Sequence, residues 1–575
     1  MRIKHFFGLA VIAAMTASCS SNNDLVNGGG NGSGENETGV GYATLSINLP
    51  TTNGTRAGDP SFEDGDAKEY DVKDVTLLIF KEAGNSENDY TFVETADLGT
   101  MAPWVKDDGN TGITTAATIT ANLDKVDLTS NYYALVILNN KDKDNALKVK
   151  MPDTDQTYND WNMATNAEGT KFADNKNGFY MANAPEFTTG EPKTLVKIEK
   201  VYATKQAAET SKATTIHVER GLAKVTVASL PTNLNPPADS KYHEDVVDIT
   251  AWNLDVTNKS TFPIHKTAGL TTNFTTIWSA STEAAPSTGR FVDGSNTAFK
   301  RVYWGVDPNY GTDYTTVADC EKEFTVLKSN AEINGDAATP QYCLENTFDI
   351  KHMLQGQTTR VVFKAKYTPK GFNAGDTFYK IGNNTDLWSK TTLEEQIKAK
   401  AQEVLGKESA TNKVEVDLKA ADNNIEENAG TKILKEANVQ HNGANVAPEE
   451  IKAINEKLGL KAATETDPIV GIATYASGES YYIARIKHFG NDLTPWNEGD
   501  LTYGDNDATQ NKKYLGRYGV LRNNWYELTV QSVSGPGTPD VPTIKPDVPD
   551  DESYRYISVS VKILDWAKRS QNVDL

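Results

Sequence analysis

Tyr556-Ile557-Ser558-Val559-Ser560-Val561-Lys562-Ile563, near the C-terminus, has the clearest strand pattern from which to interpret the rest of the chain. After the tyrosine, apolar and polar residues alternate strictly, which is the period of a half-buried β-strand. A second stretch near the other end of the chain, Tyr42-Ala43-Thr44-Leu45-Ser46-Ile47-Asn48-Leu49, follows the same pattern position by position. Two interchangeable strands suggest one groove that either of them can fill. Any β-rich protein also has several alternating strands, so the flanking sequences must decide between these interpretations.

The groove hypothesis assigns a role to each apolar position of the two strands. The strand over 42–49 would be removable, and the strand near the C-terminus would be a donor that replaces it. The expected groove-filling side chains are Ala43, Leu45, Ile47 and Leu49 in the removable strand and Ile557, Val559, Val561 and Ile563 in the donor strand.

Composition favours a folded, strand-rich chain. The 575 residues are 38% hydrophobic, Thr, Asn, Asp and Gly are abundant, and long helical patterns are few. These features predict an all-β protein of several domains. The formal net charge is −21 and no dense Lys/Arg stripe occurs, so a nucleic-acid partner is not expected.

The N-terminus has the features of an export signal. Arg2 and Lys4 precede an apolar run over 6–15 that is too short to remain as a membrane-spanning helix. The run ends in Thr16-Ala17-Ser18-Cys19, which resembles the lipobox of bacterial lipoproteins, although Thr16 replaces the usual leucine. We expect a lipid such as palmitate on Cys19 and attachment to the outer membrane. The alternative is an ordinary signal peptide with an incidental cysteine.

The other cysteines, Cys320 and Cys343, form a possible disulfide, because paired cysteines in exported proteins are commonly bonded. The alternative is two reduced, buried thiols.

Two segments flank the removable strand. A Gly/Asn/Ser-rich stretch over 22–41 reads as a flexible tether. After Pro50 comes a polar loop with Gly and Pro, and Arg56 is its first basic residue. Exposed loops of this kind are where proteases cut, so we expect cleavage between Arg56 and Ala57 by an Arg-specific surface protease.

Further strands, two helices and a linker complete the chain. The helices are expected after Thr392, in a capping box with Glu395, and at Pro448, as insertions that cover a sheet edge. Gly535 to Glu552 contains five prolines, which favours an extended linker able to carry the donor strand to a neighbour. The predicted strands cover 75–80, 132–138, 215–227, 252–256, 301–304, 360–367, 481–486 and 524–530.

Motifs for catalysis are missing from the sequence. Cys-x-x-Cys, His-Glu-x-x-His, Gly-x-Ser-x-Gly and Walker patterns do not occur, and the seven histidines are scattered singly. The acidic stretch 140–145 has the alternating oxygens of a calcium loop but lacks the downstream Gly and Glu of an EF-hand. We therefore expect no enzymatic activity, no cofactor and no metal site.

Four features together resemble the fimbrillins, the type V pilin family of Bacteroidia. They are the lipobox around Cys19, the Thr-Arg-Ala-Gly-Asp run over 55–59, the Val-Glu-Arg-Gly-Leu-Ala-Lys-Val strand over 218–225, and the Arg-Tyr-Gly-Val-Leu-Arg-Asn-Asn-Trp-Tyr run over 517–526 before the linker and last strand. The run over 55–59 is similar to the processing site of the Mfa-type fimbrillins, the major-fimbrium subunits. The resemblance implies two transthyretin-like β-sandwich domains and polymerisation by strand exchange.

On this basis the chain is expected to be a subunit of cell-surface fimbriae that serve adhesion and biofilm formation. Its partners would be further copies of itself in a head-to-tail filament, and anchor and tip subunits. The expected segments are a signal peptide over 1–19, a tether with the removable strand over 20–56, β-sandwich domains over 57–232 and 233–534, a linker over 535–553 and the donor strand over 554–575. The alternatives are a tip or accessory adhesin of the same fimbrium and a surface glycan-binding lipoprotein.

Overall fold

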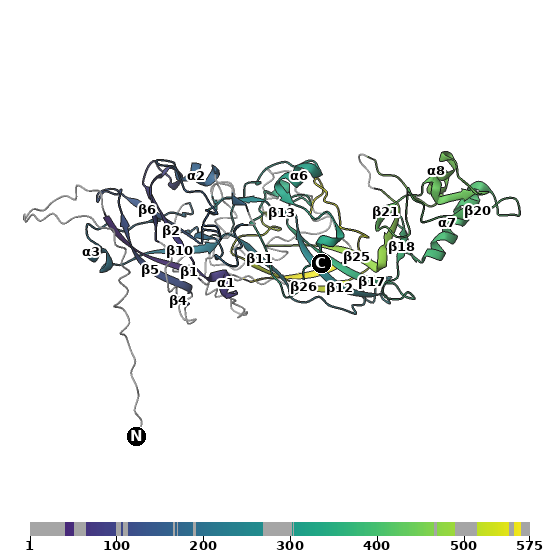
Figure 1. The fold of residues 1–575 in the computed structure, drawn as a ribbon, viewed down its shortest axis with the longest axis horizontal. Coiled ribbons are helices and arrows are strands. Elements are labelled where there is room, and N and C mark those ends of the chain that lie inside the picture. The colour runs from purple at the N-terminus through teal and green to yellow at the C-terminus, as the bar shows by residue number, and fades with distance from the viewer. Residues whose placement is uncertain are drawn as a thin grey trace, which may run out of the picture.

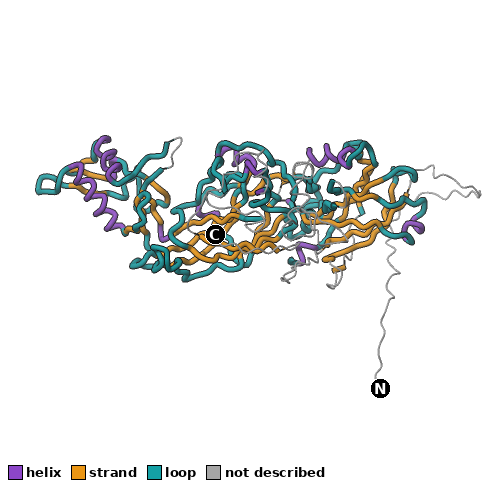
Figure 2. The backbone as a smooth tube through the Cα atoms, turned by 180° about the vertical axis from the view of Figure 1, so that it is seen from behind, coloured by secondary structure: helices purple, strands orange, loops and turns teal. Residues whose placement is uncertain are grey.

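The computed structural model describes most of the chain between Gly41 and Leu564. The described residues are 41–50, 65–98, 105–106, 113–164, 167–168, 171–187, 191–267, 302, 304–464, 469–488, 514–550 and 557–564. They form an elongated molecule of three bodies in a row, which Figures 1 and 2 show from opposite sides. Strands dominate and helices are few, which confirms the predicted fold class.

The N-terminal body is built on a nine-stranded sheet system with the order β3-β2-β6-β8-β10-β1-β5-β4, with β9 also paired to β6. The strands are β1 (Gly41–Pro50), β2 (Val75–Lys81), β3 (Thr91–Asp97), β4 (Val105–Lys106), β5 (Ile113–Leu123), β6 (Tyr132–Leu138), β8 (Met181–Asn183), β9 (Val196–Lys197) and β10 (Thr214–Arg220). The first half of β10 pairs with β1 and its second half pairs with β8. The strand therefore joins two sheet halves that enclose one hydrophobic core.

The C-terminal body consists of two further sheets around a second core. One sheet has the order β16-β11-β26-β27 and the other has the order β12-β17-β25. These strands are β11 (Ala223–Val227), β12 (Val246–Asp255), β16 (Gln341–Cys343), β17 (Arg360–Thr368), β25 (Glu479–Arg485), β26 (Trp525–Val533) and β27 (Ile557–Leu564).

A third body lies at the far end of the molecule, next to β17 and β25 (Figure 1). It has its own hydrophobic core, which includes Leu393 and Ile397 of one helix and Ile454 of the other. The two helices are therefore part of a small domain and do not merely cover a sheet edge, as the sequence suggested. The elements are β18 (Phe378–Ile381), β19 (Leu387–Trp388), α7 (Lys390–Leu405), β20 (Val414–Val416), β21 (Gly430–Lys432), β22 (Val439–His441), β23 (Ala444–Asn445), α8 (Pro448–Lys457) and β24 (Ile472–Tyr475).

The remaining elements are short and decorate the first two bodies. They are α1 (Ala67–Tyr70), α2 (Tyr158–Ala164), β7 (Ala167–Glu168), α3 (Lys205–Glu209), β13 (Thr257–Asn258), β14 (Ser260–Thr261), α6 (Val317–Glu323) and β15 (Phe324–Thr325), with several 3-10 turns. Among the described residues, no helix has the length and apolar character needed to cross a membrane.

Several predicted boundaries change in the structure. The expected strand over 215–227 is two strands, because the chain turns at Gly221, where an added Cβ would lie 2.8 Å from Tyr180 Cδ1. The first core includes Leu222 and the second begins with Ala223, upstream of the expected domain boundary at 232. Helix α7 is capped by Ser389 and not by Thr392. Pro448 does begin α8, as predicted.

Candidate functional site

The removable strand predicted from the sequence is an interior strand of the N-terminal body. β1 runs antiparallel to β5 on one side and parallel to β10 on the other. Its pairing with β5 extends over the whole strand, and Leu45 to Asn48 also pair with residues 214–217 of β10. Because β1 lies between two partners, its departure would divide the sheet and leave two open edges.

The inner face of β1 contributes directly to the core. Ala43, Leu45, Ile47 and Leu49 are each at most 1% exposed and belong to the N-terminal hydrophobic core. These are the four residues that the alternating pattern singled out. The structure therefore places all four in one row against the core, between β10 and β5.

The C-terminal strand lies on the other body of the same chain. β27 pairs antiparallel with β26 and is the edge strand of its sheet. In this register Ile557 pairs with Val533 and Val561 with Leu528, and Val559 and Ile563 pair with Val530 and Tyr526. The expected donor strand therefore has one strand partner in the structure, whereas β1 has two.

The linker before β27 is attached to its own domain. It contains no strand between 535 and 550, as the prolines predicted, but it does not extend away from the body. Tyr481 and Thr538 exchange two backbone hydrogen bonds of 2.9 Å, and Arg360 Nη2 donates to the carbonyl of Pro542 at 2.8 Å. The expectation of a free spacer over the whole segment is therefore wrong, because backbone and side-chain bonds hold it to β17 and β25.

The linker's last described residue is also its most tightly bound. Asp550 is buried, its carboxylate lies 2.7 Å from Arg485 Nε, and Thr358 Oγ1 donates to it at 2.6 Å. Burial raises the pKa of Asp550, and the neighbouring Arg485 opposes that shift. Any release of β27 that leaves this anchor intact must therefore begin after Asp550.

A buried ion pair connects the segment after β1 to the C-terminal body. Glu69 of α1 is fully buried, and its Oε1 lies 2.8 Å from Nζ of Lys224 in β11. Tyr342 of β16 also hydrogen-bonds this carboxylate. The Lys224 ammonium lies 3.8 Å from the ring centre of Trp525, in a cation–π contact. Helix α1 is thus held by β11 and β16 of the C-terminal sheet, and β26 contacts the lysine of the pair.

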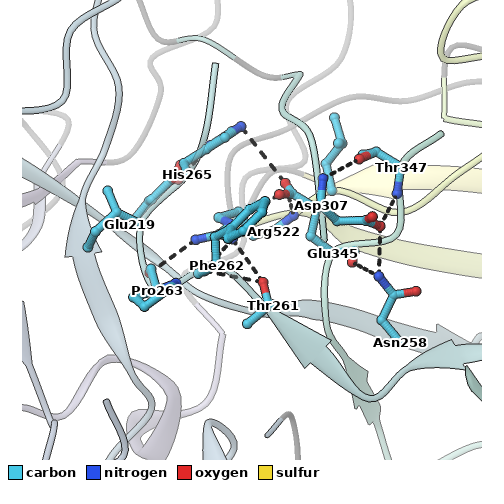
Figure 3. A network of polar contacts seen from close by, with 12 residues as sticks. Glu219, Asn258, Thr261, Phe262, Pro263, His265, Asp307, Glu345, Thr347 and Arg522 are labelled. Carbon is cyan, nitrogen blue, oxygen red and sulfur yellow. Dashed lines mark hydrogen bonds and ion pairs between the residues drawn. The ribbon is translucent and has the colours of Figure 1, made fainter. Parts of the chain in front are cut away.

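A second buried network also joins the N-terminal body to the C-terminal body (Figure 3). His265 Nδ1 lies 2.8 Å from Oε1 of Glu219, at the end of β10. Arg522, just before β26, contacts Glu345 and donates to Thr261 Oγ1 at 3.1 Å. Each of these five residues is less than 4% exposed. The charged groups of this network therefore face one another inside the protein.

Asp307 lies in the same network and has an unusual environment. Asn258 Nδ2 donates to its Oδ2 at 2.7 Å, and the backbone amide of Thr347 donates to the same oxygen at 2.8 Å. Burial raises the pKa of Asp307 to about 7, against the lowering effect of these hydrogen bonds. The carboxyl therefore titrates near neutral pH.

The two sequence motifs from distant parts of the chain lie side by side. Arg220 Nη1 donates to the side-chain oxygen Oδ1 of Asn523 at 3.3 Å. The backbone N–H of Asn523 donates to the carbonyl of Leu222 at 2.6 Å. Strands β11 and β26 then continue as a parallel pair. The runs over 218–225 and 517–526 therefore form the junction between the two bodies.

The predicted disulfide is wrong. Cys320 and Cys343 are both free and buried. Cys320 lies on α6 and packs in a small cluster with Phe324 and Ile544, whereas Cys343 lies on β16 in the main C-terminal core. The two thiols belong to different clusters, so the alternative of reduced, buried cysteines holds. Burial also raises the pKa of the Cys320 thiol to about 11.

Other predicted sites lie outside the described residues, namely Cys19, Arg56 and Ala57. Glu69 and Asp307 could not be predicted from the sequence, because single acidic residues have no local pattern that marks them as buried. Within the described part of the chain, no group of three His, Cys, Asp or Glu side chains is arranged to hold a metal ion.

Residues 473–572 match the family model described as "Major fimbrial subunit protein type IV, Fimbrillin, C-terminal". Among the curated proteins, none matches.

Similar solved structures include a candidate cell adhesion protein from Parabacteroides distasonis, with TM-score 0.38 and 8% identity, covering 92% of this chain and 98% of that one. Another is the tip fimbrial protein Mfa3 from Porphyromonas gingivalis with C-terminal truncation, with TM-score 0.28 and 11% identity, covering 91% of this chain and 100% of that one. At these TM-scores the structural likenesses carry no weight in assigning a function.

The family match covers β24 through β27, with the junction motif, the linker and the C-terminal strand between its ends. The C-terminal part of the chain therefore matches the fimbrillin family over residues 473–572.

Proposed function

We propose that this fimbrial protein is a repeating stalk subunit that polymerises by donor-strand exchange. A protease cuts after Arg56, β1 leaves, and the C-terminal strand of another copy enters the vacated groove between β10 and β5. The observation that carries the proposal is the position of β1. It is an interior strand whose inward-facing side chains are fully buried, and the expected cleavage point lies just beyond its end.

The groove that β1 leaves would be strongly apolar. Leu45, Ile47 and Leu49 are fully buried against the core. Burial of a large aliphatic side chain contributes about 1.5–3 kcal/mol, so these three residues give roughly 5–9 kcal/mol as an upper estimate. Without a replacement strand this free energy is lost. The cleaved subunit therefore has a strong tendency to bind a strand of matching pattern.

The two positions of the C-terminal strand differ in backbone pairing. As an edge strand on β26, β27 has hydrogen-bonding partners on one side only. In the groove it would pair with both β10 and β5, as β1 does. Each additional backbone hydrogen bond contributes about 0.5–1.5 kcal/mol net. In the exchange, the C-terminal strand therefore gains backbone hydrogen bonds along its second edge.

An edge strand is also the easier one to release. Removal of β27 uncovers one side of β26 and leaves the pairing of β26 with β11 intact. The linker bonds up to Asp550 can stay in place during the exchange. The C-terminal body thus keeps its sheets while the strand leaves.

The contact between copies is head-to-tail, and such a contact does not close on itself, so it builds a filament. The same proposal includes export as a lipoprotein with a lipid on Cys19, attachment to the outer membrane, an Arg-specific surface protease, and anchor and tip subunits as further partners. The protein is structural in this proposal and catalyses no reaction.

Electron microscopy of the purified precursor before and after treatment with an Arg-specific protease tests the proposal. We expect monomers before cleavage and filaments afterwards. The Arg56→Ala precursor, treated in the same way, is the control and should stay monomeric. Cleaved protein that remains monomeric at high concentration would contradict the proposal.

A further inference from the structure

The outer face of β1 is covered at its N-terminal end by one short segment, Val201–Glu209, here named the strap. Tyr42 and Tyr202 exchange two backbone hydrogen bonds of 2.8 Å, which attaches the strap to the start of β1. Helix α3, within the strap, lies against both β1 and β5. Its Ala208 is fully buried but belongs to none of the hydrophobic clusters. The strap therefore covers the outer, hydroxyl-bearing side of the sheet.

The strap leaves no space for a side chain at the first position of β1. A Cβ added at Gly41 would lie 2.3 Å from Val201 Cγ1 and 2.9 Å from Val126 Cγ2. Both valines pack in or against the core, and Val126 is only 2% exposed. Neither side chain can move aside without disturbing that packing, because core side chains are close-packed.

Gly41 lies on the inward face of β1 with Ala43 and Leu45, whereas Thr44 and Ser46 lie on the outer face and differ in how far they are covered. Thr44 is 9% exposed, and its Oγ1 lies 2.9 Å from Oγ1 of Thr120 on β5. Ser46 is only half-buried, and its strand neighbours Thr118 and Thr215 are exposed. A large side chain can therefore project outward at position 46 but not at position 44.

We propose that the strap is a specificity gate of the groove, which requires a small residue at the position of Thr44 and leaves no room for a paired side chain at the position of Gly41. This inference rests on the proposed strand exchange and names which partner strand fits. The partner is a second copy of this chain, whose C-terminal strand aligns with β1 by its Tyr-apolar-polar pattern.

In this alignment Ser558 takes the place of Thr44, and its small side chain meets the requirement. Arg555 aligns with Gly41 and does not fit beside Val201. The incoming strand must therefore stop pairing at Tyr556. The strap thus sets the register of the exchanged strand and excludes strands with a large residue at the Thr44 position.

The test uses the intact precursor, kept uncut by Arg56→Ala, so that neither processing nor polymerisation is needed. Thr44→Phe and Gly41→Arg are compared with Ser46→Phe, which adds a large side chain on the same face as Thr44. We expect the first two to lower Tm by about 5 °C, as overpacking does, and the control to change it little. Val201→Ala added to Gly41→Arg should restore part of the loss.

The gate is contradicted if Thr44→Phe and Gly41→Arg shift Tm no more than Ser46→Phe, or if Val201→Ala restores nothing. The same substitutions answer a separate question from the proposed function. If the precursor variants behave as expected while cleaved wild-type protein stays monomeric, the strap's selectivity for β1 stands and strand exchange between copies is contradicted.

Discussion

Lys224 Nζ lies 2.8 Å from Glu69 Oε1, and both side chains are almost completely buried. The pair joins α1, which follows the expected cleavage point in the chain, to the C-terminal sheet. The segment after the cut is therefore anchored independently of β1. In the proposed exchange, β1 can leave while the new N-terminal segment keeps its place between the two bodies.

Removal of one member of this pair should destabilise the protein strongly. Lys224→Met leaves the Glu69 carboxylate buried without its cation, which we expect to cost about 3–5 kcal/mol in free energy of unfolding. The double variant Lys224→Met, Glu69→Gln should recover much of that loss. Urea titration measures both effects. Lys73→Met, which breaks the exposed pair with Asp71, is the control, with an expected change of about 0–1 kcal/mol. Equal losses of unfolding free energy for Lys224→Met and Lys73→Met would contradict this role of the buried Glu69–Lys224 pair.

The stability of the domain junction should fall as pH rises from about 4 to 7. The pKa of Asp307 is raised to about 7 in the folded protein, from an ordinary value of 3.8. Between pH 3.8 and 7 the folded protein holds a proton on this carboxyl that the unfolded chain has lost, so unfolding releases a proton in this range. The contribution of Asp307 to stability is therefore fully present below pH 3.8 and is lost as pH rises through 7. Free energies of unfolding at several pH values, compared with those of Asp307→Asn, measure this contribution. An identical pH dependence in both proteins would contradict it.

A change at the expected cleavage point should keep the first strand in its groove. Arg56→Ala removes the basic residue that an Arg-specific protease needs, so we expect a folded monomer that retains β1. N-terminal sequencing of surface polymer from the unchanged chain should give a mature terminus at Ala57. A different terminus, or normal polymer from the variant, would show that cleavage occurs elsewhere.

The alternating pattern was sufficient to locate β1 and its inward-facing side, because a strand with one face on a core has a period of two. Leu45 and Ile47 are buried as that pattern requires. The near-continuous apolar runs at β2 and β6 likewise gave buried strands, in which every position except Lys81 is covered. Local sequence thus carried most of the strand positions.

Local sequence could not predict which distant segments of the chain contact each other. The pairing of Arg220 with Asn523 joins residues separated by about three hundred positions, and no pattern within either segment specifies the other. The position of the linker on its own domain could not be predicted from local sequence for a related reason. Proline-rich composition predicts an extended backbone, but hydrogen bonds from Arg360 and Tyr481 decide that this backbone lies on its own domain.

Truncation after Glu552 removes β27 but keeps the anchored linker. We expect the N-terminal and C-terminal bodies to fold and cleavage to proceed, because β26 keeps its pairing with β11. Polymer should not form. The double change Val559→Asp, Val561→Asp should have the same effect, since charges in an apolar groove are costly. SDS-resistant ladders from the cleaved, truncated protein, or an unfolded monomer, would contradict the role given to this strand.

In the proposed exchange, Ser558 of one copy takes the place of Thr44 in another, and a cysteine cross-link can detect this arrangement. Thr44 pairs with Thr120 on β5, whereas Ser558 pairs with Ser532 when β27 remains on its own β26. Directly paired cysteines on antiparallel strands are within disulfide range. A mixture of cleaved Thr120→Cys and Ser558→Cys subunits should therefore give covalent dimers on oxidation. Filaments that form without these dimers would contradict the claim.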